Sequence, residues 1–216
     1  MSTTPDALVV RTMTAADLPG VVTLHLRSFT AEESYAVALG PRFVSKSYEF
    51  FLHDPKAFAF VAIYQGTVVG IVNGTLESAY GPGLRRYTVK AAALAFLTHP
   101  KLWLDKRVRT RAGKIFHRNF IDRRPPGQNM AVPRPPSTRD THTSCLAYFA
   151  LHADYANLRI GDALLERAET YSREQHMQFV EAGVRKENTK ARFSYKKRGY
   201  RREDTSTGDV LFVLEL

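Results

Sequence analysis

Two short stretches of the chain carry residue types that suit the binding of an anionic ligand and the movement of a proton. The first runs from Leu151 to Leu165, where a predicted strand passes through a turn into a predicted helix that begins near Asn157. The start of a helix leaves backbone N–H groups without partners, and the helix dipole attracts anions there. Asn157 is also a residue type favoured at a helix N-cap. We therefore expect this turn to bind an anion.

The second stretch has the spacing Asn188-x-x-Ala191-x-x-x-Tyr195-x-x-x-Gly199-Tyr200. On a helix, Ala191 and Tyr195 are four residues apart and share a face. Asn188 can cap that helix, and Gly199 is a good C-terminal stop. The spacing therefore predicts a short helix that presents Ala191 and Tyr195 together.

These motifs resemble those of the GNAT superfamily of N-acetyltransferases. The family pattern Asn-x-x-Ala-x-x-x-Tyr-x-x-x-Gly-Phe/Tyr is complete at residues 188–200, and the family's Ile-Gly-x-x-Leu-Leu run is intact at 160–165. The opening segments at 9–11 and 14–18 and the Val68-Val69-Gly70 strand are also similar to the family. The resemblance covers roughly residues 7–77 and 143–216.

The resemblance implies an α+β fold, with a central mixed, mostly antiparallel sheet flanked by helices, in one domain over residues 1–216. It implies an acyltransferase that moves an acetyl group from acetyl-CoA to a primary amine by direct attack on the thioester, without a metal. Tyr195 matches the tyrosine often assigned as the general acid for the leaving thiolate; the alternative is a core tyrosine on an amphipathic helix. The positions that the resemblance places against acetyl-CoA are Phe149, Leu151, Leu158, Arg159, Ile160, Gly161, Asp162, Asn188, Ala191 and Tyr195.

The general base has several candidates near the predicted strand ends, namely Glu77, Asp140, His142 and His152. His152 follows the strand that precedes the expected phosphate turn, and histidine has the most suitable ordinary pKa. Glu77 leaves the third predicted strand toward the expected cleft. The alternatives are a structural role for both residues and an ordered water as base.

The phosphate turn departs from the family. A turn of the form Gln/Arg-x-x-Gly-x-Gly/Ala holds the pyrophosphate there, and positions 156–161 agree only at Gly161. Arg159 replaces a glycine, and Asp162 adds a carboxylate that should weaken anion binding. Arg159 can offset that charge by reaching the phosphates itself.

Hydrophobic periodicity and turn residues predict the elements that position these motifs. Strands are expected at 7–10, 57–64, 67–76, 144–151, 178–184 and 210–216, with a hairpin turn at Gln65-Gly66. Helices are expected at 14–30, 32–53 (broken at Gly40-Pro41), 84–98, 102–120, 157–176 and 188–198. Gly70 and Gly74 within the second long strand predict bulges or the close approach of a ligand.

Residues 78–141 form a predicted basic, helical and Pro-rich insertion between the third and fourth strands. Between Leu84 and Arg124 there are twelve Lys/Arg and two acids, so this segment holds the whole net charge of +10. A cationic segment favours a phosphate-bearing small-molecule acceptor, and its apolar residues, including Trp103, also suit a membrane surface or a homodimer contact. Two further hypotheses stay open: a longer acyl donor (acyl-CoA or acyl carrier protein), and a non-catalytic module that binds nucleic acid or membrane. We rank nucleic acid below a small acceptor.

Composition excludes several classes of site and location. Cys145 is the single cysteine, so no internal disulfide or cysteine zinc site can form, and buried packing is its expected role. The seven histidines show no metal-ligand spacing. The start of the chain lacks the basic and apolar regions of a signal peptide, and the longest apolar run, residues 91–97, is too short to span a bilayer. A cytoplasmic protein is the expectation.

Overall fold

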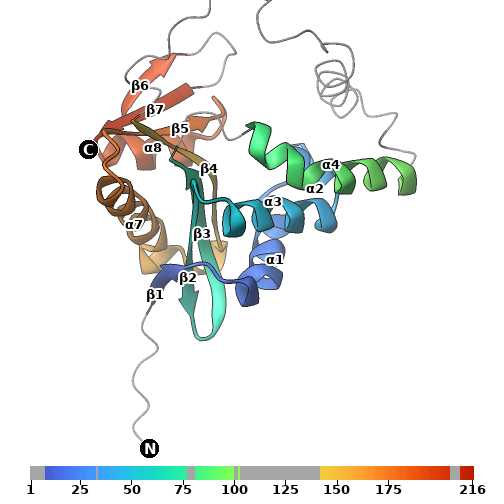
Figure 1. Ribbon diagram of the computed structural model, residues 1–216. Coiled ribbons are helices and arrows are strands. Elements are labelled where there is room, and N and C mark those ends of the chain that lie inside the picture. Colours follow the sequence, from blue (N-terminus) through green and yellow to red (C-terminus); the bar gives the residue numbers. More distant parts are fainter. Residues whose placement is uncertain (1–7, 33, 77–80, 100–101, 103–141, 205–209) are drawn as a thin grey trace, which may run out of the picture.

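The computed structural model describes residues 8–32, 34–76, 81–99, 102, 142–204 and 210–216. These residues form one mixed sheet of seven strands in the order β1-β2-β3-β4-β5-β7-β6 (Figure 1). The strands are β1 (Val9–Thr12), β2 (Ala57–Tyr64), β3 (Thr67–Thr75), β4 (Thr143–Leu151), β5 (Phe179–Val184), β6 (Arg201–Asp204) and β7 (Val210–Glu215). The pairing of β4 with β5 is parallel, and the other neighbours pair antiparallel. The expected α+β fold with a mostly antiparallel sheet is therefore confirmed.

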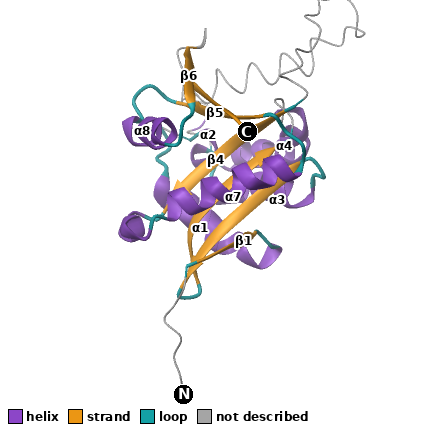
Figure 2. Cartoon of the chain, turned by 90° about the vertical axis from the view of Figure 1, so that its left-hand side faces the viewer, coloured by secondary structure: helices purple, strands orange, loops and turns teal. Residues whose placement is uncertain are grey.

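Helices cover both faces of the sheet. The helices are α1 (Leu18–Ser28), α2 (Tyr35–Ala38), α3 (Pro41–His53), α4 (Gly81–Thr98), α7 (Ile160–Glu174) and α8 (Thr189–Lys197), with 3-10 turns at Ala15–Asp17 and Ala153–Leu158. Figure 1 shows α1, α3 and α4 on one side of the sheet and α7 on the other, and Figure 2 shows α7 lying across the strands. No helix among the described residues is long and apolar enough to cross a membrane.

Strand β2 shows how the sequence builds two cores. Phe58, Phe60 and Ala62 pack into the core with α7 and α8, while Ala59 and Val61 pack into the core with α1 and α3. Because successive side chains of a strand point to opposite faces, an almost continuous apolar run is what a strand covered on both faces requires. The turn after β2 is the predicted one, since Gln65 and Gly66 both have positive φ, 50° and 72°.

The two strand glycines have different roles. A β-bulge lies beside Gly74, since Asn73 pairs with Tyr148 and Gly74 pairs with Leu146, which confirms the bulge prediction there. At Gly70 the close neighbour is helix α7, where the sequence had suggested a bulge or a ligand. A Cβ at Gly70 would lie 2.6 Å from Cγ2 of Ile160 and 2.7 Å from Cδ1 of Leu164, so the missing side chain lets α7 pack closely on β3.

Several elements differ from the sequence expectations. The first strand begins at Val9 rather than residue 7 and continues to Thr12, because it pairs with residues 60–63 of β2. The expected helix at 32–53 is two helices, with Gly40 at φ 88° before Pro41. The short strand β6 was missed, because Arg-Arg-Glu-Asp lacks an apolar pattern and lies at the sheet edge.

A further correction concerns the start of α7. The expected helix from Asn157 is instead a 3-10 turn followed by α7 from Ile160, because Arg159 between them adopts the left-handed conformation (φ 51°, ψ 29°). Of the expected basic insertion, α4 and Leu102 lie within the described residues, whereas residues 103–141 lie outside them.

Candidate active site

The candidate site lies where β4 and β5 separate. Their pairing runs from Thr143 opposite Phe179 to Leu146 opposite Ala182, and no further pair is present in the described part of these strands. A cavity of about 1270 Å³ begins there. Residues 146–149 of β4 and 182–184 of β5 form its two walls.

One end of the cavity is formed by α8. Asn188 is the N-cap of this helix, and its Oδ1 accepts a hydrogen bond from the backbone N–H of Ala191 at 3.1 Å, as the sequence predicted. Asn188, Ala191 and Tyr195 all line the cavity, together with Phe149 of β4. The fold therefore brings four of the expected cofactor residues together.

Tyr195 combines deep burial with access to the cavity. The residue is 4% exposed, and its ring stacks on Phe212 with centroids 5.6 Å apart. Burial, together with the nearby Glu169, raises the pKa of Tyr195 above its ordinary value. The phenol therefore keeps its proton at neutral pH, which is the state that a proton donor needs.

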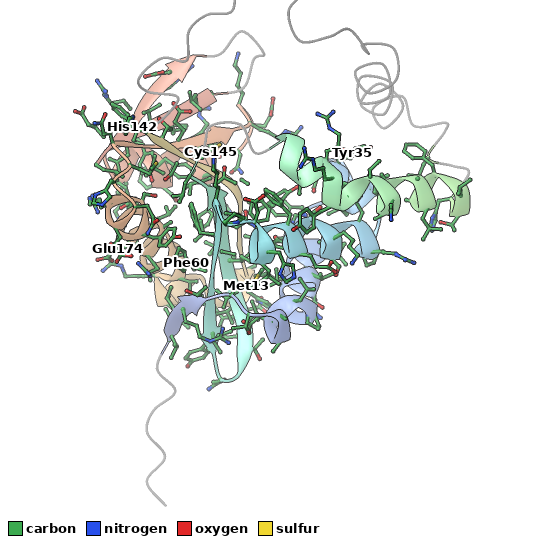
Figure 3. All side chains as sticks on the ribbon, in the orientation of Figure 1. Met13, Tyr35, Phe60, His142, Cys145 and Glu174 are labelled. Carbon is green, nitrogen blue, oxygen red and sulfur yellow. The ribbon has the colours of Figure 1, made fainter. Side chains whose placement is uncertain are left out.

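Another part of the cavity lining comes from elements that pack on the other face of the sheet. Ser28, Phe29 and Ser34, from the end of α1 and the segment before α2, belong to it with Tyr35 of α2. Leu84, Arg85 and Thr88 of α4 complete this part, and Figure 3 labels Tyr35 beside α4. The cavity thus reaches from α8 to the helices on the other face.

The expected phosphate turn starts α7 but does not contribute to the described lining of the cavity. Leu151, Leu158, Arg159, Ile160, Gly161 and Asp162 are all outside that lining. A Cβ at Gly161 would lie 3.1 Å from Cδ1 of Leu151, so this glycine allows the helix start to sit close to β4. The first N–H groups of α7 have no partner within the helix, as at the start of any α-helix.

Two arginines offset the negative charge of the Asp162 carboxylate. Arg159 donates to Asp162 Oδ2 from Nε at 3.2 Å and from Nη2 at 3.1 Å, and Arg198 Nη1 lies 3.9 Å from Oδ1. The left-handed backbone of Arg159 also explains why a glycine suits this position in the family motif, since glycine adopts positive φ without a steric cost. The departure at Asp162 is thus compensated locally.

The two base candidates that the structure describes, His142 and His152, do not line the cavity. Glu77 and Asp140 lie outside the described residues. His142 precedes β4, at the end of the strand away from the separation (Figure 3). His152 caps the turn after β4, where its Nδ1 accepts from the N–H of Asp154 at 3.4 Å, and it is absent from the described lining.

Five charged residues line the cavity: Glu32, Arg85, Arg185, Glu187 and Lys190. Arg85 belongs to the predicted basic segment, whereas the sequence analysis missed the other four. Arg185 Nη1 donates to the carbonyl of Glu32 at 3.4 Å, so it joins the end of β5 to the segment before α2. The position of Arg185 directly after a predicted strand was the available signal.

Comparison with known proteins identifies the family of the chain. The model of the Acetyltransferase (GNAT) family matches residues 20–200. The chain belongs to the GNAT family. Acetyl transfer is the general reaction of this family. No curated protein sequence matches the chain at a significant level.

Solved structures share the fold at low sequence identity. The PaiA N-acetyltransferase from Thermoplasma acidophilum, in complex with coenzyme A, has a TM-score of 0.60 at 12% identity over 97% of this chain and 99% of that chain. The GNAT domain of PAT from S. lividans has a TM-score of 0.59 at 16% identity over 98% and 97%. The ribosomal-protein-S18-alanine N-acetyltransferase from Escherichia coli has a TM-score of 0.55 at 11% identity over 97% and 94%. At these identities the similarity concerns the fold.

Proposed function

We propose that this GNAT chain transfers an acetyl group from acetyl-CoA to the primary amine of a small acceptor by direct attack on the thioester. The observation that carries the proposal is the cavity between β4 and β5, whose lining combines Asn188, Ala191 and Tyr195 with several charged side chains. The Thermoplasma acidophilum neighbour in complex with coenzyme A supports the same cofactor for this fold.

The residues present fit a coenzyme A ligand. The cavity of about 1270 Å³ exceeds the ~300–1,000 Å³ of a typical small-molecule site, so it has room for a long arm and an acceptor. Phe149 and Ala191 would contact the apolar part of the arm. The N–H groups at the start of α7, with the exposed guanidinium of Arg159, would hold the phosphates.

The chemistry requires a nucleophilic amine and a proton for the leaving sulfur. Acetyl-CoA supplies an activated carbonyl group when bound. Tyr195 is the proposed donor to the sulfur, because its buried phenol is protonated and its ring lies near that of Phe149 in the cavity lining, with centroids 6.5 Å apart. Glu77 stays a candidate for the base on its position in the sequence, whereas His152 does not line the described cavity.

The charged residues in the cavity lining favour an acceptor with an anionic group. Arg85, Arg185 and Lys190 contribute three positive charges, against two negative charges from Glu32 and Glu187. Guanidinium groups recognise carboxylate and phosphate by paired hydrogen bonds. The proposed acceptor class is therefore a small amine that carries a phosphate or a carboxylate.

Calorimetric titration with acetyl-CoA tests the proposal. Wild type should bind at micromolar concentration, Tyr195→Phe should bind with a similar Kd, and Arg159→Glu should weaken binding by about tenfold or more through lost and reversed charge. Arg173→Glu, at an exposed position in the last turn of α7, is the matched control for the charge change. Absence of heat and of thermal stabilisation with wild type would refute the cofactor assignment.

A further inference from the structure

A buried chain of hydrogen bonds joins three helical segments on the acceptor side of the sheet. His25 of α1 has Nδ1 2.9 Å from the hydroxyl oxygen of Tyr48 on α3, and Nε2 3.1 Å from Oγ of Ser34. His25 is 1% exposed, and Tyr48 is fully buried. The imidazole is therefore held at both ring nitrogens by neutral hydroxyl groups.

Ser34 connects this chain to the cavity. Ser34 is a lining residue, 9% exposed, and is the N-cap of α2. An N-cap serine usually accepts a hydrogen bond from its own helix, but this hydroxyl caps nothing and contacts His25 instead. The side chain is thus positioned by His25 rather than by the helix that it begins.

Aromatic rings close off the histidine from the rest of the cavity. The His25 ring lies 4.7 Å from the ring of Phe29 and 5.1 Å from that of Tyr148, measured between centroids. Phe29 and Tyr148 are themselves lining residues. Of the two hydroxyl groups that the structure places on the His25 ring, that of Ser34 belongs to a residue lining the cavity, so it can carry a proton between His25 and a ligand.

We propose that Ser34 takes the proton from the acceptor nitrogen during acetyl transfer and passes its own proton to His25. This proposal rests on the proposed function of the same cavity. It gives the site a base, which neither His152 nor His142 supplies from where it lies. Ser34 is the group that touches the substrate, while His25 and Tyr48 position it.

The proposed step conserves protons and electrons. The lone pair of the neutral amine forms the C–N bond and the C–S bond breaks, so its electron pair goes to sulfur. The amine proton moves to Ser34 Oγ as the Ser34 proton moves to His25 Nε2, and sulfur receives a proton from Tyr195. His25 then returns its proton through Ser34, and Tyr195 is reprotonated from solvent, which leaves amide and thiol as the only products.

The surroundings of His25 keep its imidazole ring neutral at neutral pH. Burial lowers the pKa of His25 to about 4, so the ring is neutral at neutral pH and one nitrogen has a free lone pair. The titratable side chains that face it are Tyr48 of α3 and Tyr148 of β4, and the described contacts of the ring include no charged group. The proposed proton transfer from Ser34 to His25, called the relay below, requires the tautomer in which Nδ1 donates to Tyr48 and Nε2 accepts from Ser34.

The first measurement is independent of turnover. Long-range proton–nitrogen NMR of the His25 ring, in the protein without acetyl-CoA, should show the proton on Nδ1. In Ser34→Ala the Nε2 signal should shift, because its hydrogen bond is lost. A proton held on Nε2 in wild type would overturn the proposal.

The second measurement uses hydroxylamine as a small surrogate acceptor, with acetohydroxamate as the product. Ser34→Ala and His25→Gln should each lower kcat by about 10²-fold with KM for acetyl-CoA unchanged, the range expected of general base catalysis, and Ser34→Thr should restore most of the rate. The solvent deuterium isotope effect of wild type should shrink in Ser34→Ala, which a purely structural role would not cause. Ser47→Ala is the matched control, since Ser47 is buried on α3 and bonds to the carbonyl of Phe43.

The outcomes separate the two proposals. Calorimetric binding of acetyl-CoA without any wild-type rate above the buffer reaction overturns the proposed transfer, and the relay with it. With an active wild type, a Ser34→Ala variant that keeps the wild-type kcat, or one whose loss is matched by Ser47→Ala, overturns the relay alone. Absence of acetyl-CoA binding overturns the proposed function and the relay together.

Discussion

The buried histidine makes a specific prediction about stability and pH. The pKa of His25 is lowered by burial from 6.5 to about 4, so between these values the unfolded chain binds a proton that the folded chain does not. Because the unfolded state binds more protons, stability falls as the pH falls through this window. With these two pKa values, linkage gives a loss of about 2 kcal/mol between pH 7 and pH 5.

Urea unfolding followed by circular dichroism at pH 7, 6 and 5 measures this loss. At pH 7, His25→Gln should be less stable than wild type by roughly 1–3 kcal/mol, because it disturbs two buried hydrogen bonds. The gap should shrink by about 2 kcal/mol at pH 5, since the variant lacks the group that titrates. His53→Gln, at an exposed position on α3, controls for the loss of an imidazole outside the core.

A gap that stays constant from pH 7 to pH 5 would refute the argument that His25 is buried in its neutral form. Should His25→Gln fail to fold, an NMR pH titration of the His25 ring in wild type gives the same answer. A midpoint near the ordinary histidine value would then contradict the burial of the ring.

Three further predictions concern α7 and its contacts. Arg159→Gly should raise the free energy of unfolding by about 0.5–1 kcal/mol by relieving the left-handed backbone, as measured in urea, and Arg159→Ala should show no such gain. Gly70→Ala should lower the free energy of unfolding by about 1–3 kcal/mol, because the added methyl group overpacks against α7. An unchanged melting temperature would contradict this. Glu169→Gln should cost about 2–3 kcal/mol, because it leaves the guanidinium of Arg198, 2.7 Å away, without its buried partner, whereas Glu166→Gln on the exposed face of α7 should change little.

Local sequence patterns determined most of the secondary structure. The strand at 57–64 has the bounds that its apolar run predicted, and Gln65-Gly66 forms the turn that its residue types require. The cap at Asn188 and the stop at Gly199 were also predicted, because both depend on residues within one turn of helix. The motif at 188–200 was sufficient to indicate the family, which the family model confirms.

The tertiary structure decided where elements start and which edges pair. The sequence did not reveal that Arg159 takes a left-handed conformation, because arginine has no preference for it and only the packing of α7 imposes it. The charged strand β6 forms because β7 offers an edge, not because of its own pattern. The gap between β4 and β5 depends on pairing that stops at Leu146 and Ala182, and no local signal marks that point.

The same limit applies to the most informative cluster of the site. His25, Ser34 and Tyr48 are nine to twenty-three residues apart in the chain, and each reads alone as an ordinary helix or turn residue. They meet because α1, α2 and α3 pack on one face of the sheet, which is a consequence of apolar burial rather than of polar spacing. The sequence alone determined the family, the fold class and the α8 motif; packing across the sheet decided which polar groups face the cavity.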